Sequence, residues 1–190
     1  MPRDVSTLTP NEQAMATTFQ RRRLQTHFTN TSIPSGNTVT NTSSETDFES
    51  QITLPPNIIT EGQAFHLRAY GVLSTSFFAT LTLRFYVGSN ALVVMGPISF
   101  SAAPANAPWK AECDISCASE GVTGSWLASG VFSLNDSGSF WSLGDRIYDP
   151  YVNTSAVTVD TFAENTLKLS AQWSFAAASE TVTMRQIIAR

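Results

Sequence analysis

The chain has 190 residues, of which 14% are charged and 42% hydrophobic, and its formal net charge at pH 7 is −4. Soluble domains usually carry nearer a quarter of charged residues, so Ser and Thr supply much of the polar surface here. An acidic chain with few basic residues argues against nucleic acid as a partner, because that binding depends on neutralising phosphates. The sequence contains neither an apolar run of about 18 residues nor the apolar core of a secretory signal, so we expect no membrane partner.

Residues 1–36 are predicted to form an N-terminal anchoring arm and linker. Thr9 suits the N-cap of a short helix, Pro10 its first turn and Glu12 a capping box. The helix would carry a thin apolar stripe, which consists of Met15, Phe19 and Leu24. Such a stripe is too narrow to hold a lone helix in water. We therefore expect the arm to lie against its own domain, a neighbouring copy or a larger assembly, with a disordered leader as the alternative.

A basic run of three arginines, Arg21, Arg22 and Arg23, lies within this arm. Three arginines neutralise only a few phosphates, so any binding to nucleic acid would be weak and sensitive to salt. We prefer an interpretation in which they contact an acidic protein surface or the carbonyl groups at a helix C-terminus. Plain solvation and contact with nucleic acid are the alternatives.

Residues 37–190 are predicted to form one β-sandwich domain, because apolar and polar residues alternate in segment after segment. A period of two is typical of strands with one buried and one wet face. Five segments show it, and the residues predicted to point inward are Phe48, Ile52 and Leu54; Phe65, Leu67 and Ala69; Ala79, Leu81, Leu83, Phe85 and Val87; Trp109, Ala111, Cys113, Ile115 and Cys117; and Leu167, Leu169, Ala171, Trp173 and Phe175.

The remaining strands are shorter or less regular. In residues 125–133 either Trp126, Ala128 and Phe132 or the opposite parity could point inward. Residues 91–95, ALVVM, are predicted to be a short strand buried on both faces. Further strands are expected at TVTNT, SAVTVDT and TVTMRQIIA.

Turn signals such as LPPN, GSN, GPIS and NDSGS recur between the strands at intervals of about 10 to 15 residues. Many short alternating strands with this spacing indicate an antiparallel sandwich or barrel. We therefore predict an all-β fold, an antiparallel two-sheet jelly-roll sandwich, preceded by the N-terminal arm with its candidate helix.

The two cysteines, Cys113 and Cys117, are predicted to be buried thiols rather than a disulfide. Positions i and i+4 of a strand share a face but lie about 13 Å apart, whereas a disulfide needs Cα atoms within about 7 Å. No histidine lies close to them in the sequence, so the pair is also weak as a metal site.

Motifs for catalysis are missing from the sequence. The two histidines, His27 and His66, are far apart, and His66 is predicted to be a solvated or interface residue on an outward strand face. Glu112 and Asp114 fall on the outward parity of their strand, so they are poor candidates for a catalytic carboxylate pair. We predict no enzymatic activity, no catalytic residues, no metal and no cofactor.

An aromatic cluster over residues 140–151 is the second candidate contact region, and its residues are Phe140, Trp141, Tyr148 and Tyr151. Aromatic residues are enriched where proteins bind one another, and they also stack on sugars. Capping of the core, a subunit contact and carbohydrate binding all stay open for this cluster.

Four segments, in this order, resemble a family of bacteriophage proteins: TVTNTSSETDFESQITLPPNIITEGQAFHLRAYGVLST, TLTLRFYVG, APWKAECDISC and NTLKLSAQWS. They are similar to virion structural proteins of tailed phages, namely head decoration (cement) proteins and head fibres, over roughly residues 38–188. The resemblance implies a jelly-roll domain that forms trimers on a capsid or fibre and has no enzymatic activity.

We therefore expect a capsid decoration protein that stabilises the phage head as a homotrimer, made in the host cytoplasm and located on the capsid surface. Its partners would be copies of itself and the major capsid protein or another virion protein. The candidate contact residues of the arm are Met15, Phe19, Arg21, Arg22, Arg23 and Leu24. The alternatives are a head or tail fibre that recognises host glycan through the aromatic cluster, and a small jelly-roll coat protein of an icosahedral virus.

Overall fold

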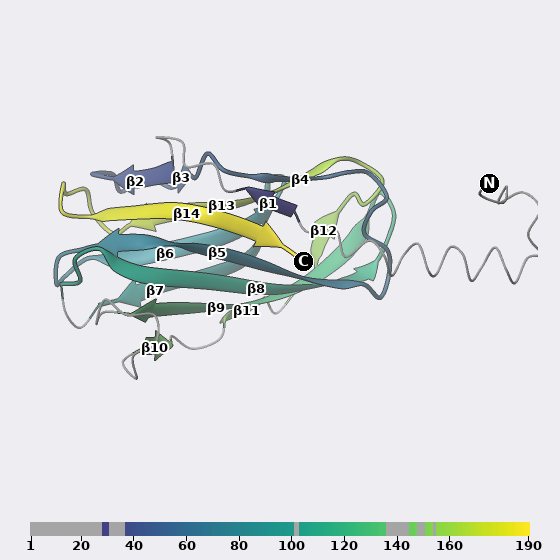
Figure 1. Ribbon diagram of the computed structural model, residues 1–190. Helices are drawn as coiled ribbons and strands as arrows, with labels where there is room; N and C mark the ends of the chain where they lie inside the picture. The colour runs from purple at the N-terminus through teal and green to yellow at the C-terminus, as the bar shows by residue number, and fades with distance from the viewer. Residues whose placement is uncertain (1–27, 31–36, 101–102, 136–144, 148–150, 154) are drawn as a thin grey trace, which may run out of the picture.

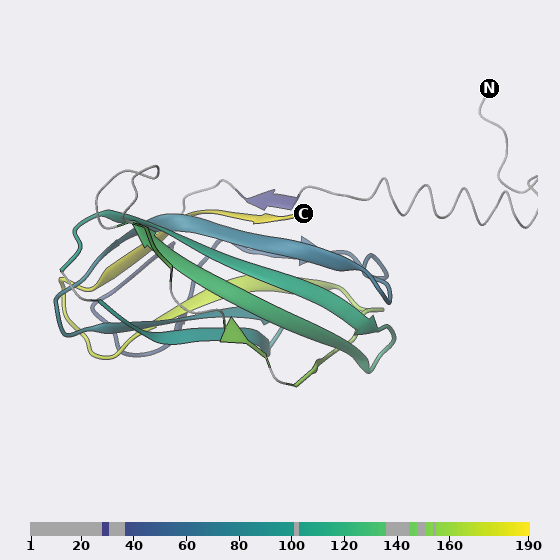
Figure 2. The same ribbon diagram turned by 90° about the horizontal axis from the view of Figure 1, so that it is seen from below.

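The protein is a sandwich of two antiparallel β-sheets, seen in a computed structural model that describes residues 28–30, 37–100, 103–135, 145–147, 151–153 and 155–190 (Figures 1 and 2). The predicted fold class is confirmed at this level. Within these ranges no helix has the length and hydropathy needed to cross a membrane.

The first sheet is built on four long strands, with shorter strands at its edges. Its path runs through β1 (Phe28–Asn30), β14 (Thr181–Ala189), β5 (Ala64–Ser74), β8 (Ala107–Ser119), β9 (Gly124–Asn135) and β10 (Asp145–Ile147). Three further strands pair off this path: β2 (Thr38–Thr40) with β14, and β11 (Tyr151–Val152) and β12 (Val157–Val159) with β9.

The second sheet is smaller. Its path runs through β3 (Thr46–Asp47), β13 (Asn165–Trp173), β6 (Thr80–Val87) and β7 (Asn90–Ser99), and β4 (Ile52–Leu54) pairs with β13. Three of the connections that cross between the sheets lie close together at one end of the sandwich, namely those between β5 and β6, between β7 and β8, and between β13 and β14. These crossings lie on the left of Figure 1.

The core is the single apolar layer between the two sheets, and it contains nearly all the residues predicted to point inward. Trp109, Trp126 and Trp173 are buried completely or almost so. Trp109 stacks on Phe132 with ring centroids 6.3 Å apart. Burial of Trp126, Ala128 and Phe132 settles which parity of β9 faces inward.

Two details of the sequence prediction are wrong. Residues 91–95 are not buried on both faces, because Val94 is 45% exposed, and they belong to a longer strand, β7, that also includes the predicted turn GPIS. A register irregularity opposite Phe85 and Tyr86 turns both Leu92 and Val93 inward, which alternation alone does not reveal. Phe175 lies beyond the end of β13 and is 39% exposed.

The prediction for the cysteines is confirmed. Cys113 and Cys117 are free thiols, and both are buried on the inward face of β8. Burial raises the pKa of both thiols, so they behave as small apolar residues.

The candidate residues of the arm, Met15 to Leu24, lie outside the described residues. The backbone of β1, within the segment predicted as arm and linker, pairs with β14 in the register Phe28 to Ala189.

Gly71 in the middle of β5 has no room for a side chain. A Cβ atom there would lie 1.9 Å from the carbonyl oxygen of Thr183 and 2.7 Å from the ring of Trp109. We expect Gly71→Ala to lower the free energy of unfolding by about 3 kcal/mol, because overpacking against backbone cannot relax cheaply. Urea denaturation measures this.

Gly130→Ala is the matched control, since a Cβ there would meet its neighbours at 3.2–3.3 Å and two of the three are side-chain atoms. Gly130→Ala should lower the free energy of unfolding by clearly less than Gly71→Ala does. Equal losses for the two variants would contradict this account of Gly71.

Candidate functional site

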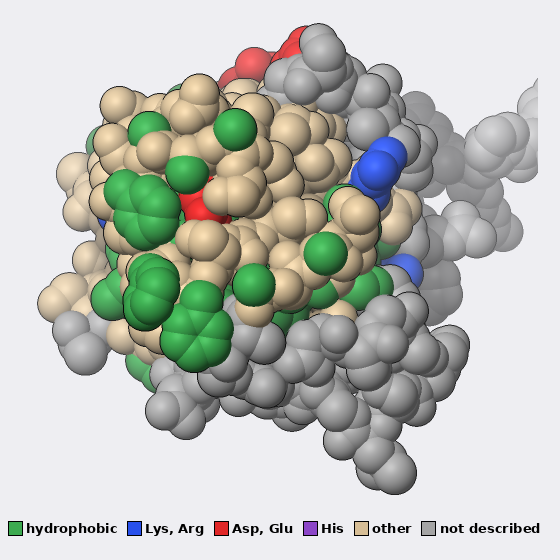
Figure 3. All heavy atoms as spheres, turned by 90° about the vertical axis from the view of Figure 1, so that its left-hand side faces the viewer, with side chains coloured by type: hydrophobic (Ala, Val, Ile, Leu, Met, Phe, Trp, Pro, Cys, Tyr) green, Lys and Arg blue, Asp and Glu red, His purple; other side chains and the backbone are tan. Residues whose placement is uncertain are grey.

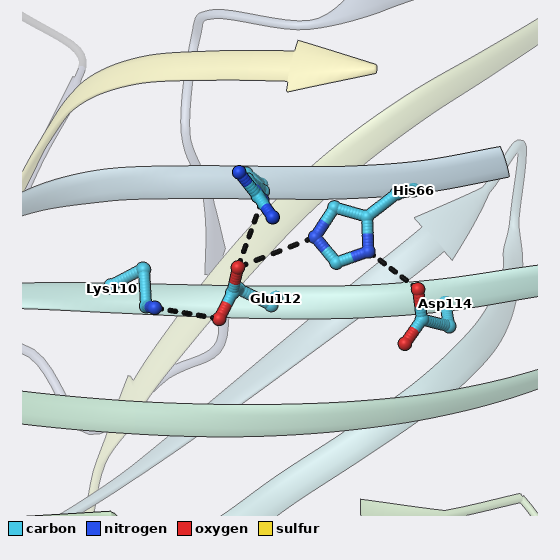
Figure 4. A network of polar contacts seen from close by, with 5 residues as sticks. His66, Lys110, Glu112 and Asp114 are labelled. Atoms are coloured by element: carbon cyan, nitrogen blue, oxygen red, sulfur yellow. Dashed lines mark hydrogen bonds and ion pairs between the residues drawn. The ribbon is translucent and has the colours of Figure 1, made fainter. Parts of the chain in front are cut away.

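A charged cluster occupies the outer face of the first sheet, where β5 and β8 run side by side (Figure 4). The strand register places His66 opposite Asp114 and Arg68 opposite Glu112. His66 Nδ1 lies 2.5 Å from Asp114 Oδ1, and His66 Nε2 lies 3.3 Å from Glu112 Oε1. Arg68 Nε and Lys110 Nζ approach the two oxygens of Glu112 at 2.8 and 2.7 Å.

This cluster is a connected set of ion pairs centred on Glu112. Burial on its own raises the pKa of Glu112, but the hydrogen bond and charge of Lys110, with Arg68 and His66, hold that pKa below its ordinary value. Glu112 is therefore ionised at neutral pH, and its oxygens are occupied by cations. Arg68, Lys110, Glu112 and Asp114 thus bring two cations and two anions together on this face.

A second cluster lies on the outer face of the second sheet. Glu45 accepts hydrogen bonds from Tyr86 Oη and Ser170 Oγ, both at 2.6 Å, and Arg84 NH1 lies 3.2 Å from it. Lys168 Nζ contacts Asp47 Oδ2 at 2.6 Å. Two cations again face two anions.

The pKa of Tyr86 reflects this setting. Burial and then the hydrogen bond to Glu45 raise the pKa of Tyr86 to about 12. The phenol is therefore a neutral donor throughout the physiological range, and it helps to hold the segment before β3 on the sheet.

The third feature is an apolar tip at the end where the three inter-sheet crossings meet. We define the apolar tip as the exposed side chains of Phe77, Phe78 and Phe175, which are 55%, 84% and 39% exposed. The rings of Phe77 and Phe78 pack edge to face with centroids 5.4 Å apart. Figure 3 shows hydrophobic side chains gathered on this end of the molecule.

Glu180 anchors the loop that carries Phe77 and Phe78. The residue is fully buried, and its carboxylate accepts hydrogen bonds from the Ser76 amide at 3.0 and 3.2 Å, from the Thr75 hydroxyl, and from the Ser179 hydroxyl at 3.1 Å. Burial alone raises the pKa of Glu180, but these donors outweigh it and hold the pKa below the ordinary value. Glu180 is thus a charged clamp between the β13–β14 and β5–β6 loops.

Further hydrogen bonds connect the same loops. The Thr75 amide donates to the Pro104 carbonyl at 3.1 Å, which joins the β5–β6 and β7–β8 crossings. The Ser174 amide donates to the Thr80 carbonyl at 3.0 Å, and the Thr80 amide donates to Ser174 Oγ at 2.9 Å. All three crossings are therefore linked by hydrogen bonds.

The aromatic cluster predicted over 140–151 is only partly described. Phe140, Trp141 and Tyr148 lie outside the described residues. Tyr151 forms part of β11, is partly buried and packs against the core. Among the residues that the structure describes, no three His, Cys, Asp or Glu side chains gather as a metal site.

Sequence reasoning placed His66, Glu112 and Asp114 on outward faces but did not bring them together. The missing information was the register between β5 and β8. The pairing of β5 with β8, rather than with β6, follows from the crossing between sheets.

Comparisons with protein-family models and with curated proteins find no match. Among solved structures, a legume lectin-like domain from Entamoeba histolytica aligns with 100% of this chain and 98% of its own, with 8% identity and a TM-score of 0.35. A likeness this weak defines neither a family nor a function for the chain.

Replacing the Glu180 clamp tests its electrostatic role. Glu180→Gln should lower the free energy of unfolding at pH 7 by about 2 kcal/mol, because an amide group would face hydrogen-bond donors in a buried site. The folded pKa lies below 4.5, so the stabilisation is present above that pH and is lost as the pH falls through the folded pKa. The difference in free energy of unfolding between wild type and Glu180→Gln should therefore decrease from pH 7 to pH 3, as measured by urea denaturation.

Glu164→Gln, at an exposed position, is the control and should change stability by less than about 0.5 kcal/mol. If the difference in free energy of unfolding between wild type and Glu180→Gln stays constant across this pH range, Glu180 does not stabilise the loops through its charge.

Proposed function

We propose that this protein is a non-enzymatic structural protein of a virion, a decoration protein that docks on the capsid of a tailed phage as a homotrimer. The proposal joins the sequence resemblance over residues 38–188 with the character of the outer surfaces. Its role would be to reinforce the capsid lattice by binding many equivalent positions.

The observation that carries the proposal is the charge balance of both outer sheet faces. On one face Arg68 and Lys110 contact Glu112, and His66 contacts Asp114. On the other face Arg84 contacts Glu45, and Lys168 contacts Asp47. Both lysines of the described chain are used in these pairs.

Charge balance of this kind suits a surface that packs against other protein. A lone ion loses much solvation when it is buried, whereas an ion that already has its partner loses less. Five of the remaining outward positions of β9 and β14 carry Ser or Thr, namely Ser125, Ser129, Ser133, Thr181 and Thr183; the others carry Leu127, Val131, Arg185 and Gln186. Hydroxyl groups are far easier to bury than unpaired charges.

Many weak contacts would suffice for this role. A trimer that binds several capsid subunits at once gains affinity through effective concentration, without any single strong contact. The rigid sandwich supplies the fixed spacing that such multivalent binding requires.

The experiment is quantitative mass spectrometry of purified particles of the phage that encodes the chain. We expect a copy number per particle comparable with that of the major capsid protein. Particles freed of this protein should also lose their contents at lower temperature than complete ones. Absence from the particle would contradict the proposal, and only a few copies would indicate a fibre instead.

A further inference from the structure

The three loops that form the apolar end of the sandwich are almost free of charge. Residues 75–79, 100–106 and 174–180 contain Glu180 as their one charged residue. That carboxylate is buried and fully engaged by the donors of Thr75, Ser76 and Ser179. The described parts of these three loops therefore present aromatic rings among alanine, serine and threonine.

The backbone that carries the rings of the apolar tip is fixed by hydrogen bonds within the chain itself. Glu180 fixes the backbone of the β5–β6 loop, and the hydrogen bonds between Ser174 and Thr80 fix the β13–β14 loop beside it. An aromatic side chain on a rigid support loses little conformational entropy on binding. Aromatic residues, Phe among them, are enriched in protein interfaces relative to the rest of the surface.

We propose that the apolar tip is the surface through which copies of this chain associate. Each copy carries a formal charge of −4, so copies repel one another unless they meet where that charge is absent. The described loops offer such a place. An apolar surface is also complementary to itself, which a symmetric contact between identical chains requires.

A lipid bilayer fits this tip less well. Peripheral membrane contacts combine apolar residues with Lys or Arg that meet anionic head groups. The three loops contain no Lys or Arg, and the charge they do contain is negative.

The size of the tip suits the centre of a contact rather than the whole of it. From their exposed fractions, the three Phe side chains offer about 350 Å² of apolar surface. A stable interface buries about 800 Å² per partner. The flanking Ser and Thr residues must therefore contribute the rim, as they would where several tips converge on one axis.

The proposal rests on the proposed function in one respect, since it names the surface that holds the expected trimer together. The test is sedimentation velocity of the full chain over a range of concentrations. Wild type should sediment at about three times the chain mass of 20.6 kDa, and Phe77→Ser/Phe78→Ser should fall about threefold, to the mass of a single chain. A circular dichroism spectrum like that of wild type shows that the variant is folded.

The matched control changes two exposed apolar residues at the opposite end of the sandwich. Val122→Ser/Phe162→Ser alters side chains that are similarly exposed but lie in the β8–β9 and β12–β13 connections. It should keep the wild-type mass. A monomeric wild type, an unchanged mass in Phe77→Ser/Phe78→Ser, or equal dissociation of the control would each overturn the proposal.

A second measurement does not depend on the double variant folding. Phe78→Cys introduces an accessible thiol, because Cys113 and Cys117 are buried. Its reaction with a maleimide should be slow in concentrated protein and at least tenfold faster on dilution. A rate independent of concentration would overturn the proposal.

Flotation with phosphatidylcholine vesicles tests whether the apolar tip binds a lipid bilayer rather than another copy of the chain. Vesicle binding that is lost in Phe77→Ser/Phe78→Ser would assign the tip to membranes and overturn self-association. The measurement on virions is independent of all these results. An oligomer that forms through the tip but is absent from particles would contradict the proposed function alone. A virion protein that stays trimeric after Phe77→Ser/Phe78→Ser would contradict this inference alone.

Discussion

The packing of two sheets through one apolar layer is the constraint on which the rest of the structure depends. Each long strand places alternate residues in that layer, so the position of every outward side chain follows from the inward one beside it. Three buried tryptophans fill the layer, and Gly71 shows how completely the space is used, because Trp109 and the backbone at Thr183 occupy the place of a side chain there. A register slip of one residue would move the whole apolar set outward, and so the outer faces are as well determined as the core.

The two charged clusters are a consequence of this register rather than a source of stability. Ion pairs at a protein surface contribute about 0–1 kcal/mol each, which is small beside the burial of the core. The clusters instead determine how much solvation energy the outer faces would lose on contact with another molecule. His66, Arg68 and Lys110 leave no uncompensated carboxylate at Glu112, and Glu45 is satisfied in the same way by Arg84, Tyr86 and Ser170. A face whose ions already have partners can be covered by another protein with less loss of solvation than a face of separate charges.

Alternation in the sequence was enough to predict the two-sheet fold, and nearly every residue that it placed inward is buried, because each inward position is set locally by the period of two. It could not predict β7, where an irregular register turns the neighbours Leu92 and Val93 to the same side. It also could not predict the clusters or the apolar tip, since both depend on residues far apart in the chain. Thr75 and Glu180 are 105 positions apart, and Glu45 and Ser170 are 125 apart. Such contacts arise from strand order, on which local patterns carry no information. Phe175 illustrates the limit, because its parity matches the core although the strand has already ended at Trp173.

The way in which the β5–β6 loop is anchored explains why its aromatic residues face outward. A loop that contains two neighbouring Phe residues would ordinarily be held by turning at least one of them into the core, since burial of an aromatic side chain is the strongest anchor available to it. Here Ala79 takes the inward position beside the loop, and the buried Glu180 carboxylate holds the backbone through Thr75 and Ser76. Burying a carboxylate is costly unless several donors compensate it, so this is an expensive way merely to close a turn. It does allow Phe77 and Phe78 to remain on the surface in a fixed arrangement. The anchor and the exposed rings therefore belong to one arrangement, which keeps apolar surface exposed at this end of the sandwich.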